Sequence, residues 1–208
     1  MTVVAIDGPA SAGKGTLARR LAAELGLPHL DTGLLYRATG RLVLLVGADP
    51  ADPAAAERAA LDLKPDDLRR GDLRGPEADR ASSLVAAVPA VRAALLAFQR
   101  RIAAGGAVLD GRDIGTVVWP QAELKLFVTA AVEARAHRRW LELTGKGVAI
   151  TEANVEAEMR ARDAQDSSRA TAPLRPAKDA VMLDTTGLDA DAVFARAMEI
   201  VRSRVTSA

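Results

Sequence analysis

Residues 8–16, with the sequence GPASAGKGT, have the composition of a loop that binds phosphate groups. Glycines allow successive backbone N–H groups to converge on phosphate oxygens, and the start of a following helix adds partial positive charge. In such a loop a lysine, here Lys14, reaches the β- and γ-phosphates of a nucleotide. The alternative is a glycine-rich turn without a ligand, which the lysine and the strand–loop–helix context disfavour. The predicted phosphate-binding residues are Gly8, Pro9, Ala10, Ser11, Ala12, Gly13, Lys14, Gly15 and Thr16.

The residue after Lys14 departs from the general phosphate-loop pattern, which has Ser or Thr at that position. Here Gly15 follows the lysine and Thr16 comes next. The GKGT ending is similar to that of nucleoside-monophosphate kinases rather than GTPase switches, and it leaves direct Mg²⁺ ligation by a hydroxyl open. Asp110 follows an apolar run, a position suited to holding Mg²⁺ through water, although a strand-end aspartate can equally cap the next turn. We therefore predict no direct metal ligand, and a water-mediated Mg²⁺ site to which Asp110 and Thr16 are the candidates.

Residues 30–37, LDTGLLYR, contain the Asp-Thr-Gly sequence of aspartic proteases. Protease chemistry requires a second, paired aspartate and an all-β fold, and the chain offers neither. Thr32 instead stands at a strand–helix junction, where it is a good N-cap candidate. Arg37 follows one helical turn later. Exposed N–H groups at a helix start, with an arginine nearby, predict a second anion site.

The segment DGRDIGTVVWP, residues 110–120, places Arg112 and Asp113 directly after a predicted strand. The two residues could form an ordinary surface ion pair, which contributes little to stability. Because they follow a strand whose end faces the phosphate loop, we favour contact with a ligand.

Basic residues are frequent between residues 135 and 172, in a stretch that could close over a bound nucleotide. A lid supplies cations to a transferring phosphoryl group and excludes water. We assign this function to Arg138, Arg162 and Arg169. For Arg135 and Arg160 we expect a solvated helix face.

Strands alternate with helices along the chain. The predicted strands are residues 3–7, 28–31, 106–110, 124–129 and 180–185, and the predicted helices are residues 17–26, 34–46, 133–143, 152–165 and 189–205, with two more hinged near Pro89 within residues 82–104. Residues 48–79 are rich in Pro, Asp and Ala and predict an insert of one short helix and loops. This order indicates an α/β protein with a parallel sheet covered on both faces. Ligands bind at the carboxyl ends of such strands, so we expect the polar clusters at 7–16, 31–37, 110–113 and 184–186 to surround one cleft.

Composition excludes several classes of function. The 208 residues carry a net charge of only +1 and three Phe, two Trp and one Tyr, which gives no support for a nucleic-acid partner. There is no Cys, hence no disulfide or Cys-ligated zinc, and two His are too few for a His-based metal site. No apolar run approaches the ~20 residues of a membrane span, and the first seven residues resemble a strand rather than a signal peptide. We expect a cytoplasmic protein that acts as a monomer, without a membrane partner.

The motifs taken together resemble the bacterial cytidylate kinase family over nearly the whole chain. The resemblance rests on IDGPASAGKGT, LDTGLLYR, SSLVAAVPAVR, LDGRDIGTVVWP, AELKLFVTA, EARAHRR and RDAQDSSRATAPL, which occur in the family's order and approximate spacing. It implies a single domain with a five-stranded parallel P-loop kinase core (residues 1–47, 105–130 and 178–208), a small NMP-binding insert (about 32–104) and a short lid (about 138–172). It also implies transfer of phosphate from ATP to CMP or dCMP, with Mg²⁺.

The resemblance also implies roles for individual residues. Thr32, Arg37, Arg112 and Arg169 look like holders of the acceptor phosphate, Ser83, Arg92 and Asp113 like the cytosine readers, and Arg162 and Asp166 like the sugar contacts. Apart from the resemblance, we assign Lys14, Arg112 and Arg169 as the catalytic cations and Arg138 of the predicted lid to ATP binding. The chemistry of the base fits: a carboxylate such as Asp113 accepts a hydrogen bond from the cytosine N4 amine, and Arg92 can donate to N3 or O2. Uracil would place an acceptor against Asp113, and a site that loses its partner discriminates strongly.

Other functions remain as alternatives. A P-loop kinase for another small acceptor, such as UMP or dephospho-coenzyme A, is disfavoured by Arg92 and Asp113. A GTPase switch would carry an Asn-Lys-x-Asp guanine reader, which is absent because the chain's single asparagine is Asn154 in EANVEAE.

The insert departs from that of longer members of the family it resembles. Those relatives form extra antiparallel strands there, but residues 62–77 of this chain are too few and too rich in turn formers for such strands.

Overall fold

The structure, a computed structural model, describes residues 1–205. The chain divides into two compact units, which are described separately. The first, called the sheet unit here, comprises Met1–Leu30 and Ala103–Ala208, and the second, the helical unit, comprises Asp31–Ile102. The domain boundaries predicted from the sequence stay a prediction.

The sheet is parallel and has five strands in the order β2-β3-β1-β4-β5. The strands are β1 (Val3–Asp7), β2 (His29–Asp31), β3 (Ala107–Gly111), β4 (Leu124–Thr129) and β5 (Val181–Asp184). In the central strand, Ile6 lies opposite Asp110 of β3 and Leu126 of β4. Short apolar runs of this kind suit strands that are buried on both faces. The predicted sheet is confirmed, with strand ends that differ by one residue at most.

The helices of the sheet unit are α1 (Lys14–Leu25), α6 (Val132–Gly145), α7 (Glu152–Ser168) and α8 (Ala190–Val205), with a π-helical turn, η2 (Ile114–Val118). Helix α1 ends as predicted at Gly26, whose left-handed conformation (φ 64°) directs its N–H group to carbonyls of the last turn. The turn η2 was not predicted, because five residues are too few to show a helical period.

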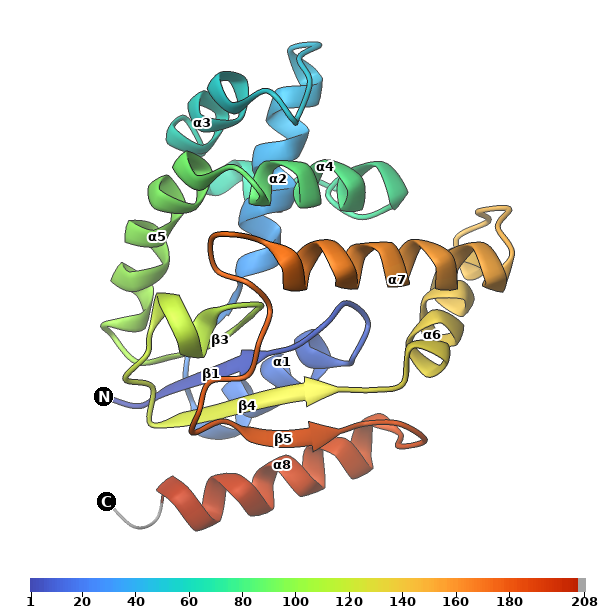
Figure 1. Ribbon diagram of the computed structural model, residues 1–208. Coiled ribbons are helices and arrows are strands. Elements are labelled where there is room, and N and C mark those ends of the chain that lie inside the picture. Colours follow the sequence, from blue (N-terminus) through green and yellow to red (C-terminus); the bar gives the residue numbers. More distant parts are fainter. Residues whose placement is uncertain (206–208) are drawn as a thin grey trace. The chain divides into compact units, whose positions relative to one another are not determined.

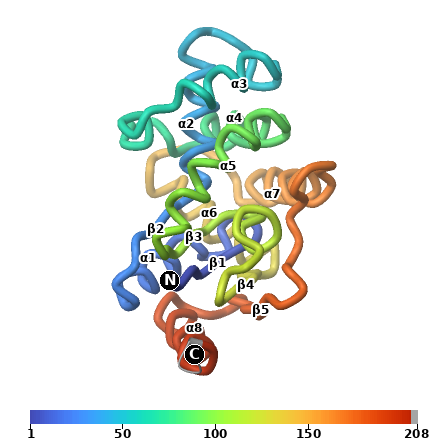
Figure 2. Tube along the Cα trace, turned by 90° about the vertical axis from the view of Figure 1, so that its left-hand side faces the viewer, coloured from blue at the N-terminus to red at the C-terminus, as the bar shows by residue number. Residues whose placement is uncertain are grey.

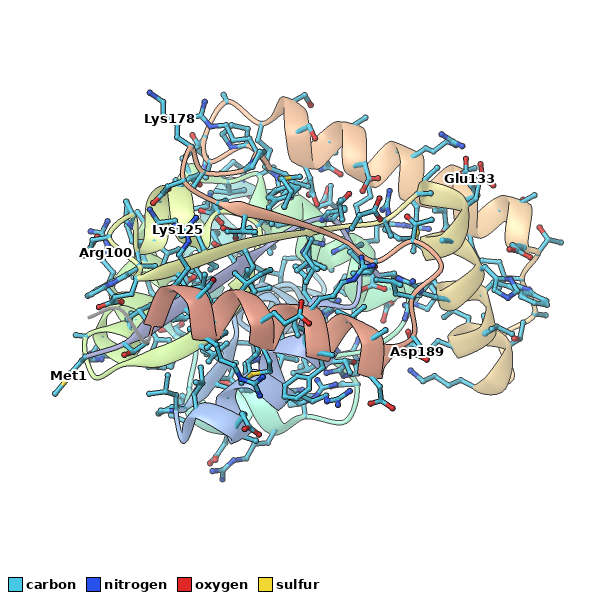
Figure 3. The ribbon with its side chains drawn as sticks, turned by 90° about the horizontal axis from the view of Figure 1, so that it is seen from below. Met1, Arg100, Lys125, Glu133, Lys178 and Asp189 are labelled. Atoms are coloured by element: carbon cyan, nitrogen blue, oxygen red, sulfur yellow. The ribbon has the colours of Figure 1, made fainter. Side chains whose placement is uncertain are left out.

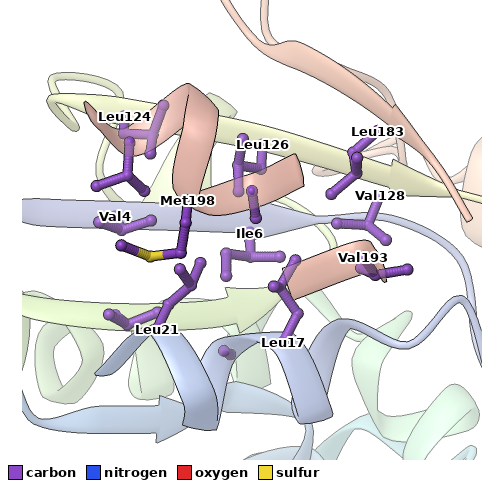
Figure 4. Close-up of a cluster of buried hydrophobic side chains, with 14 of the residues drawn as sticks. Val4, Ile6, Leu17, Leu21, Leu124, Leu126, Val128, Leu183, Val193 and Met198 are labelled. Carbon is purple, nitrogen blue, oxygen red and sulfur yellow. The ribbon is translucent and has the colours of Figure 1, made fainter. Parts of the chain in front are cut away.

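Alternation along β1 divides its side chains between the two faces of the sheet. Val4 and Ile6 point to the face covered by α1 and α8 and join the buried apolar cluster drawn in Figure 4. Figure 1 shows α8 running along the sheet next to β5. Asp7 points to the opposite face, where it accepts hydrogen bonds from the first two backbone amides of η2. Both faces of the central strand are therefore covered.

Helices α6 and α7 pack on each other through a small apolar cluster that includes Leu143 and Met159. Glu133, at the start of α6 next to α7 (Figure 3), forms an ion pair of 2.7 Å with Arg160. These two helices contain most of the segment predicted to be a lid.

The helical unit consists of α2 (Thr32–Leu45), α3 (Pro53–Leu61), a 3₁₀ turn η1 (Pro65–Arg69), α4 (Pro76–Ala86) and α5 (Pro89–Ala103). Helix α2 contacts both α3 and α4 (Figure 2). Residues 48–79 were predicted to form one short helix and loops; they contain α3, the turn η1 and the start of α4, and residues 62–77 contain no strand. The expected N-cap is wrong by one residue: Asp31 is the N-cap of α2, and Thr32 is its first helical residue.

Within residues 1–205, no single helix is long and apolar enough to cross a membrane. The pair α4 and α5, bent by 98°, meets that criterion only when the two helices are combined.

The crossing of α2 and α4 depends on the absence of a side chain at Gly40. A Cβ atom there would lie 2.9 Å from both the carbonyl carbon and the Cβ of Ala81. We predict that Gly40→Ala lowers the free energy of unfolding by about 1–2 kcal/mol, because overpacking outweighs the gain in helix propensity. Urea denaturation measures this change.

Gly145→Ala in α6 is the matched control, since its added Cβ would meet nothing within 4 Å. It should leave the stability unchanged or raise it slightly. Equal effects of the two substitutions would show that the α2–α4 crossing tolerates a methyl group.

Candidate active site

The loop between β1 and α1 has the backbone of a phosphate cradle. Gly8 has a φ of 148°, and a Cβ atom there would lie 1.9 Å from the carbonyl oxygen of Val128, so only glycine fits. Ser11 (φ 57°) and Gly13 (φ 90°) are also left-handed. Left-handed residues within a loop turn successive N–H groups toward one point, which makes an anion-binding concavity.

Lys14 is the first residue of α1, and its side chain is buried within this loop. Its Nζ atom donates a hydrogen bond of 2.6 Å to the carbonyl oxygen of Pro9. Burial lowers the pKa of Lys14 well below its usual value, and the positive charges of Arg112 and Arg162 lower it further. The negative charges of Asp110 and Asp7 raise this pKa but do not outweigh the burial. A bound phosphate would add negative charge beside Lys14 and favour its charged form.

Arg112 and Arg169 are brought together by a buried carboxylate. Asp166, whose side chain is 1% exposed, accepts a 2.8 Å hydrogen bond from Nε of Arg112 and another from Nη2 of Arg169. Burial by itself raises the pKa of Asp166, but the charges of Arg112 and Arg169 outweigh it and hold this pKa below its usual value. Burial by itself lowers the pKa of Arg112, but the negative charge of Asp166 outweighs burial, so this pKa is raised. Three predicted site residues are therefore held as one ionised cluster.

Arg162 belongs to the same basic region, because its charge lowers the pKa values of both Lys14 and Asp166. Cations from the phosphate loop, from the segment after β3 and from α7 thus act on one another. Such an arrangement favours the binding of a multiply charged anion.

Asp110 lies at the end of β3 beside the start of α1. One of its oxygens would be 3.7 Å from a Cβ atom at Gly15, and the other is 2.7 Å from Nε2 of His29. The sequence indicated Asp110 but not His29, which lies on the neighbouring strand β2, 81 residues earlier in the chain. Among residues 1–205, no group of three or more His, Asp or Glu could ligate a metal ion directly.

Arg138 contacts the segment that follows β5. It donates to the hydroxyl of Thr185 at 3.0 Å and to the carbonyl oxygens of Thr185 and Leu188 at 2.6 and 3.4 Å. The Thr185 hydroxyl in turn donates to the carbonyl of Ala12 in the phosphate loop, at 3.2 Å. The predicted cluster at residues 184–186 therefore reaches the loop, and Arg138 is linked to it through Thr185.

Arg135 is a correction to the sequence analysis, which placed it on a solvated face. It is only 4% exposed, forms a two-pronged ion pair with Asp163 (2.6 and 3.2 Å), and donates to the carbonyls of Ala130 and Ala10. The loop, α6 and α7 are thus joined by one guanidinium. Asp163 lies on another helix, so no local pattern could reveal the pair. Arg160 is exposed, as predicted, and pairs with Glu133 and Glu156.

Asp7 is a second residue that the sequence did not single out. Its two carboxylate oxygens accept hydrogen bonds of 2.7 and 2.8 Å from the amides of Ile114 and Gly115. Burial raises the pKa of Asp7 to about 6, an effect that these two hydrogen bonds and Lys14 oppose and that Asp113 reinforces. Asp113, a predicted base reader, is itself buried.

The remaining predicted residues lie in the helical unit. Arg37 donates from Nε and Nη2 to Asp79, at 3.2 and 2.9 Å, and the hydroxyl of Ser83 donates to the Asp79 carbonyl at 3.2 Å. Arg92 donates to the Ala86 carbonyl at 3.3 Å and stacks over Tyr36, 5.4 Å from the ring centre. Thr32 is buried at the start of α2. Asp79, which the sequence analysis missed, thus contacts two of the four predicted residues.

Three of the four polar clusters expected at strand ends belong to the sheet unit, and the cluster at 31–37 belongs to the helical unit.

The buried Arg135–Asp163 pair should be costly to break. We predict that Arg135→Met lowers the free energy of unfolding by about 2–3 kcal/mol, because it leaves Asp163 without its partner, although partial solvation of Asp163 reduces the loss. Arg160→Met removes two exposed ion pairs on the neighbouring surface and should leave the stability nearly unchanged. Equal losses in urea denaturation would contradict the structural role of Arg135.

The raised pKa of Asp7 makes stability depend on pH. The folded state holds this proton up to about pH 6, whereas the unfolded chain releases it near its ordinary pKa, so the stability that protonation confers is lost as the pH rises through about 6. Relative to Asp7→Asn, the unaltered chain should therefore lose about 1–2 kcal/mol of unfolding free energy between pH 5 and pH 7.5. A difference between the two proteins that stays constant across this range would contradict the assignment.

Comparison with known proteins confirms the resemblance drawn from the motifs. The family model "Cytidylate kinase" matches residues 4–203. A cytidylate kinase of Granulibacter bethesdensis is 66% identical over 203 residues, which are 97% of each chain. One of Paramagnetospirillum magneticum is 62% identical over 208 residues, 98% of this chain and 99% of that relative. A crystal structure of an uncharacterized protein from Eubacterium ventriosum shares the fold, with a TM-score of 0.59 at 14% identity, over 98% of this chain and 100% of that one. The chain therefore belongs to the cytidylate kinase family.

Proposed function

We propose that the chain transfers the γ-phosphoryl group of ATP to CMP or dCMP and releases ADP with CDP or dCDP. The observation that carries the proposal is the phosphate loop with Lys14 beside the Arg112–Asp166–Arg169 cluster, in a member of the cytidylate kinase family. Relatives of the same name match it over almost their whole length, which supports the same activity here.

The donor nucleotide is proposed to bind the loop at residues 8–16, with its β- and γ-phosphates at the converging N–H groups and Lys14. Arg138 is proposed to contribute to ATP binding, through its position next to Thr185. Mg²⁺ fits the carboxylate of Asp110, because this ion takes hard oxygen ligands and is usually held by one or two carboxylates together with phosphates and water. When bound, Mg²⁺ would neutralise charge on the phosphates; Asp110 and Thr16 would hold it through water.

The acceptor phosphate is proposed to bind Thr32, Arg37, Arg112 and Arg169. Asp113, Arg92 and Ser83 are proposed to read the cytosine, and Arg162 and Asp166 to contact the sugar. Asp166 can combine this with its hold on two arginines, because each carboxylate oxygen accepts about two hydrogen bonds.

No side chain of this chain need form a covalent intermediate in the transfer. The transition state spreads negative charge over the moving phosphoryl group, and catalysis consists of alignment and electrostatic stabilisation. Lys14, Arg112 and Arg169 are the groups proposed to supply that stabilisation. Residues of α6 and α7 are proposed to exclude water, so that ATP is not hydrolysed instead.

A kinase for UMP or dephospho-coenzyme A is not favoured, since the family and the named relatives are cytidylate kinases. The monomeric state, the cytoplasmic location and the absence of a nucleic-acid partner stay predictions.

Release of ADP from Mg·ATP in the presence of CMP, dCMP, UMP, AMP or dTMP tests the proposal directly. We expect turnover with CMP and dCMP to exceed that with UMP by at least about tenfold, because uracil would present an acceptor to Asp113. ADP release that is independent of the acceptor would refute the kinase assignment, whereas equal use of UMP and CMP would refute only the base reading.

Asp113→Ala should reduce the preference for CMP over UMP at least about tenfold. The matched control is Asp66→Ala in η1, because the Asp66 side chain is 91% exposed. Unchanged selectivity in Asp113→Ala would remove Asp113 from the base site.

A further inference from the structure

The carboxylate of Asp7 is not among the groups that the proposed function uses, although its contacts adjoin residues that are. It points away from the α1 and α8 face of the sheet and is 4% exposed. Each of its oxygens accepts one backbone N–H, from Ile114 at 2.7 Å and from Gly115 at 2.8 Å. Two bonds to successive amides fix both the position and the orientation of that peptide.

The peptide that Asp7 holds directly follows Arg112 and Asp113. The carbonyl oxygen of Asp113 is bound on its other side by the amides of Val117 and Val118, at 2.9 and 3.1 Å. The backbone of Asp113 is therefore fixed by η2 from one direction and by Asp7 from the other. These contacts leave Asp113 little freedom to move its side chain by shifting the main chain.

The close fit at Gly115 shows how tightly this segment is packed. A Cβ atom there would lie 3.1 Å from Cδ of Lys125 and 3.4 Å from Oδ2 of Asp7. Lys125 extends from β4 (Figure 3) and forms an ion pair of 2.7 Å with Asp179. The peptide at Gly115 is thus confined between the side chain of Lys125 and the carboxylate of Asp7.

The other end of the connection is the phosphate loop. Asp7 is the last residue of β1, paired with Gly111 of β3 and Phe127 of β4, and the next residue begins the loop. One side chain thus ties the segment of Arg112 and Asp113 to the strand from which the loop starts.

We propose that Asp7 is a positioning residue that fixes Arg112 and Asp113 relative to the phosphate loop and thereby sets the preference for cytosine over uracil. The inference rests on the proposed function, in which Asp113 reads the base. An asparagine cannot replace the carboxylate, because it offers one acceptor oxygen and turns an NH₂ group toward the second amide.

The test is the ratio of kcat/KM for CMP to kcat/KM for UMP, at saturating ATP, in the unaltered chain and in Asp7→Asn. A loss of folded protein lowers both values by the same factor and leaves the ratio unchanged. We expect Asp7→Asn to lower the ratio at least fivefold, with the larger change in the value for CMP.

Two further variants make the test decisive. Leu126→Ala removes a buried side chain from the α1 and α8 face of β4; it should lower stability and leave the ratio unchanged. Gly115→Ala disturbs the same contact from the amide side and should lower the ratio, and it decides the matter if Asp7→Asn does not fold.

If the unaltered chain prefers CMP and Asp7→Asn has the same ratio, the role of Asp7 is overturned and the base reading stands. If Asp7→Asn does not fold, an unchanged ratio in Gly115→Ala leads to the same conclusion. A drop of the same size in Leu126→Ala also overturns the role of Asp7, because selectivity would then follow general stability. An unaltered chain without preference for CMP overturns the base reading, and this inference with it.

Discussion

The buried carboxylate of Asp166 is the interaction on which the basic site of the sheet unit depends. Arg112 follows β3 and Arg169 follows α7, and both donate to this one side chain. Burial of a lone carboxylate or of two adjacent guanidinium groups would be strongly unfavourable, but the three together offset much of that cost. The cluster therefore brings two positive charges to one place before any ligand is present. Its net charge remains positive, which is what a phosphate requires.

The phosphate loop likewise holds a positive charge in a buried position before any ligand is present. Lys14 is buried next to like charges, and its lowered pKa records how unfavourable that environment is for an ammonium group. The arrangement persists because the backbone of the loop is fixed by steric fit: Gly8 lies against the Val128 carbonyl, and Lys14 donates to Pro9. Packing of the loop against the sheet thus keeps Lys14 in place, at a site where a bound anion would add negative charge. A preorganised site of this kind stabilises charge in a transition state without reorganising at the moment of reaction.

The sequence predicted the sheet and the phosphate loop because both are encoded locally. Each strand is a short apolar run with turn formers near its ends, and the loop is one uninterrupted motif. Three sets of contacts could not be predicted in the same way: the Arg135–Asp163 ion pair, the hydrogen bonds of Asp7 to η2, and the contacts of Asp79. Their partners lie on other elements, and a buried arginine has the same local pattern as a solvated one. The family resemblance supplied candidate roles but named none of Arg135, Asp7 and Asp79.

In the helical unit, Asp79 would compete with a phosphate for the hydrogen-bond donors of Arg37. Asp79 occupies the Nε and Nη2 donors of Arg37, so the guanidinium is not wholly available to a ligand. The remaining Nη1 lies toward the first turn of α2, where a Cβ atom at Gly33 would be 3.2 Å from it. A helix start presents backbone N–H groups without intrahelical partners. The same Cβ position would lie 3.0 Å from Oδ1 of Asp31, so a phosphate at Nη1 would share the helix start with this carboxylate, while Asp79 keeps the guanidinium in a fixed plane.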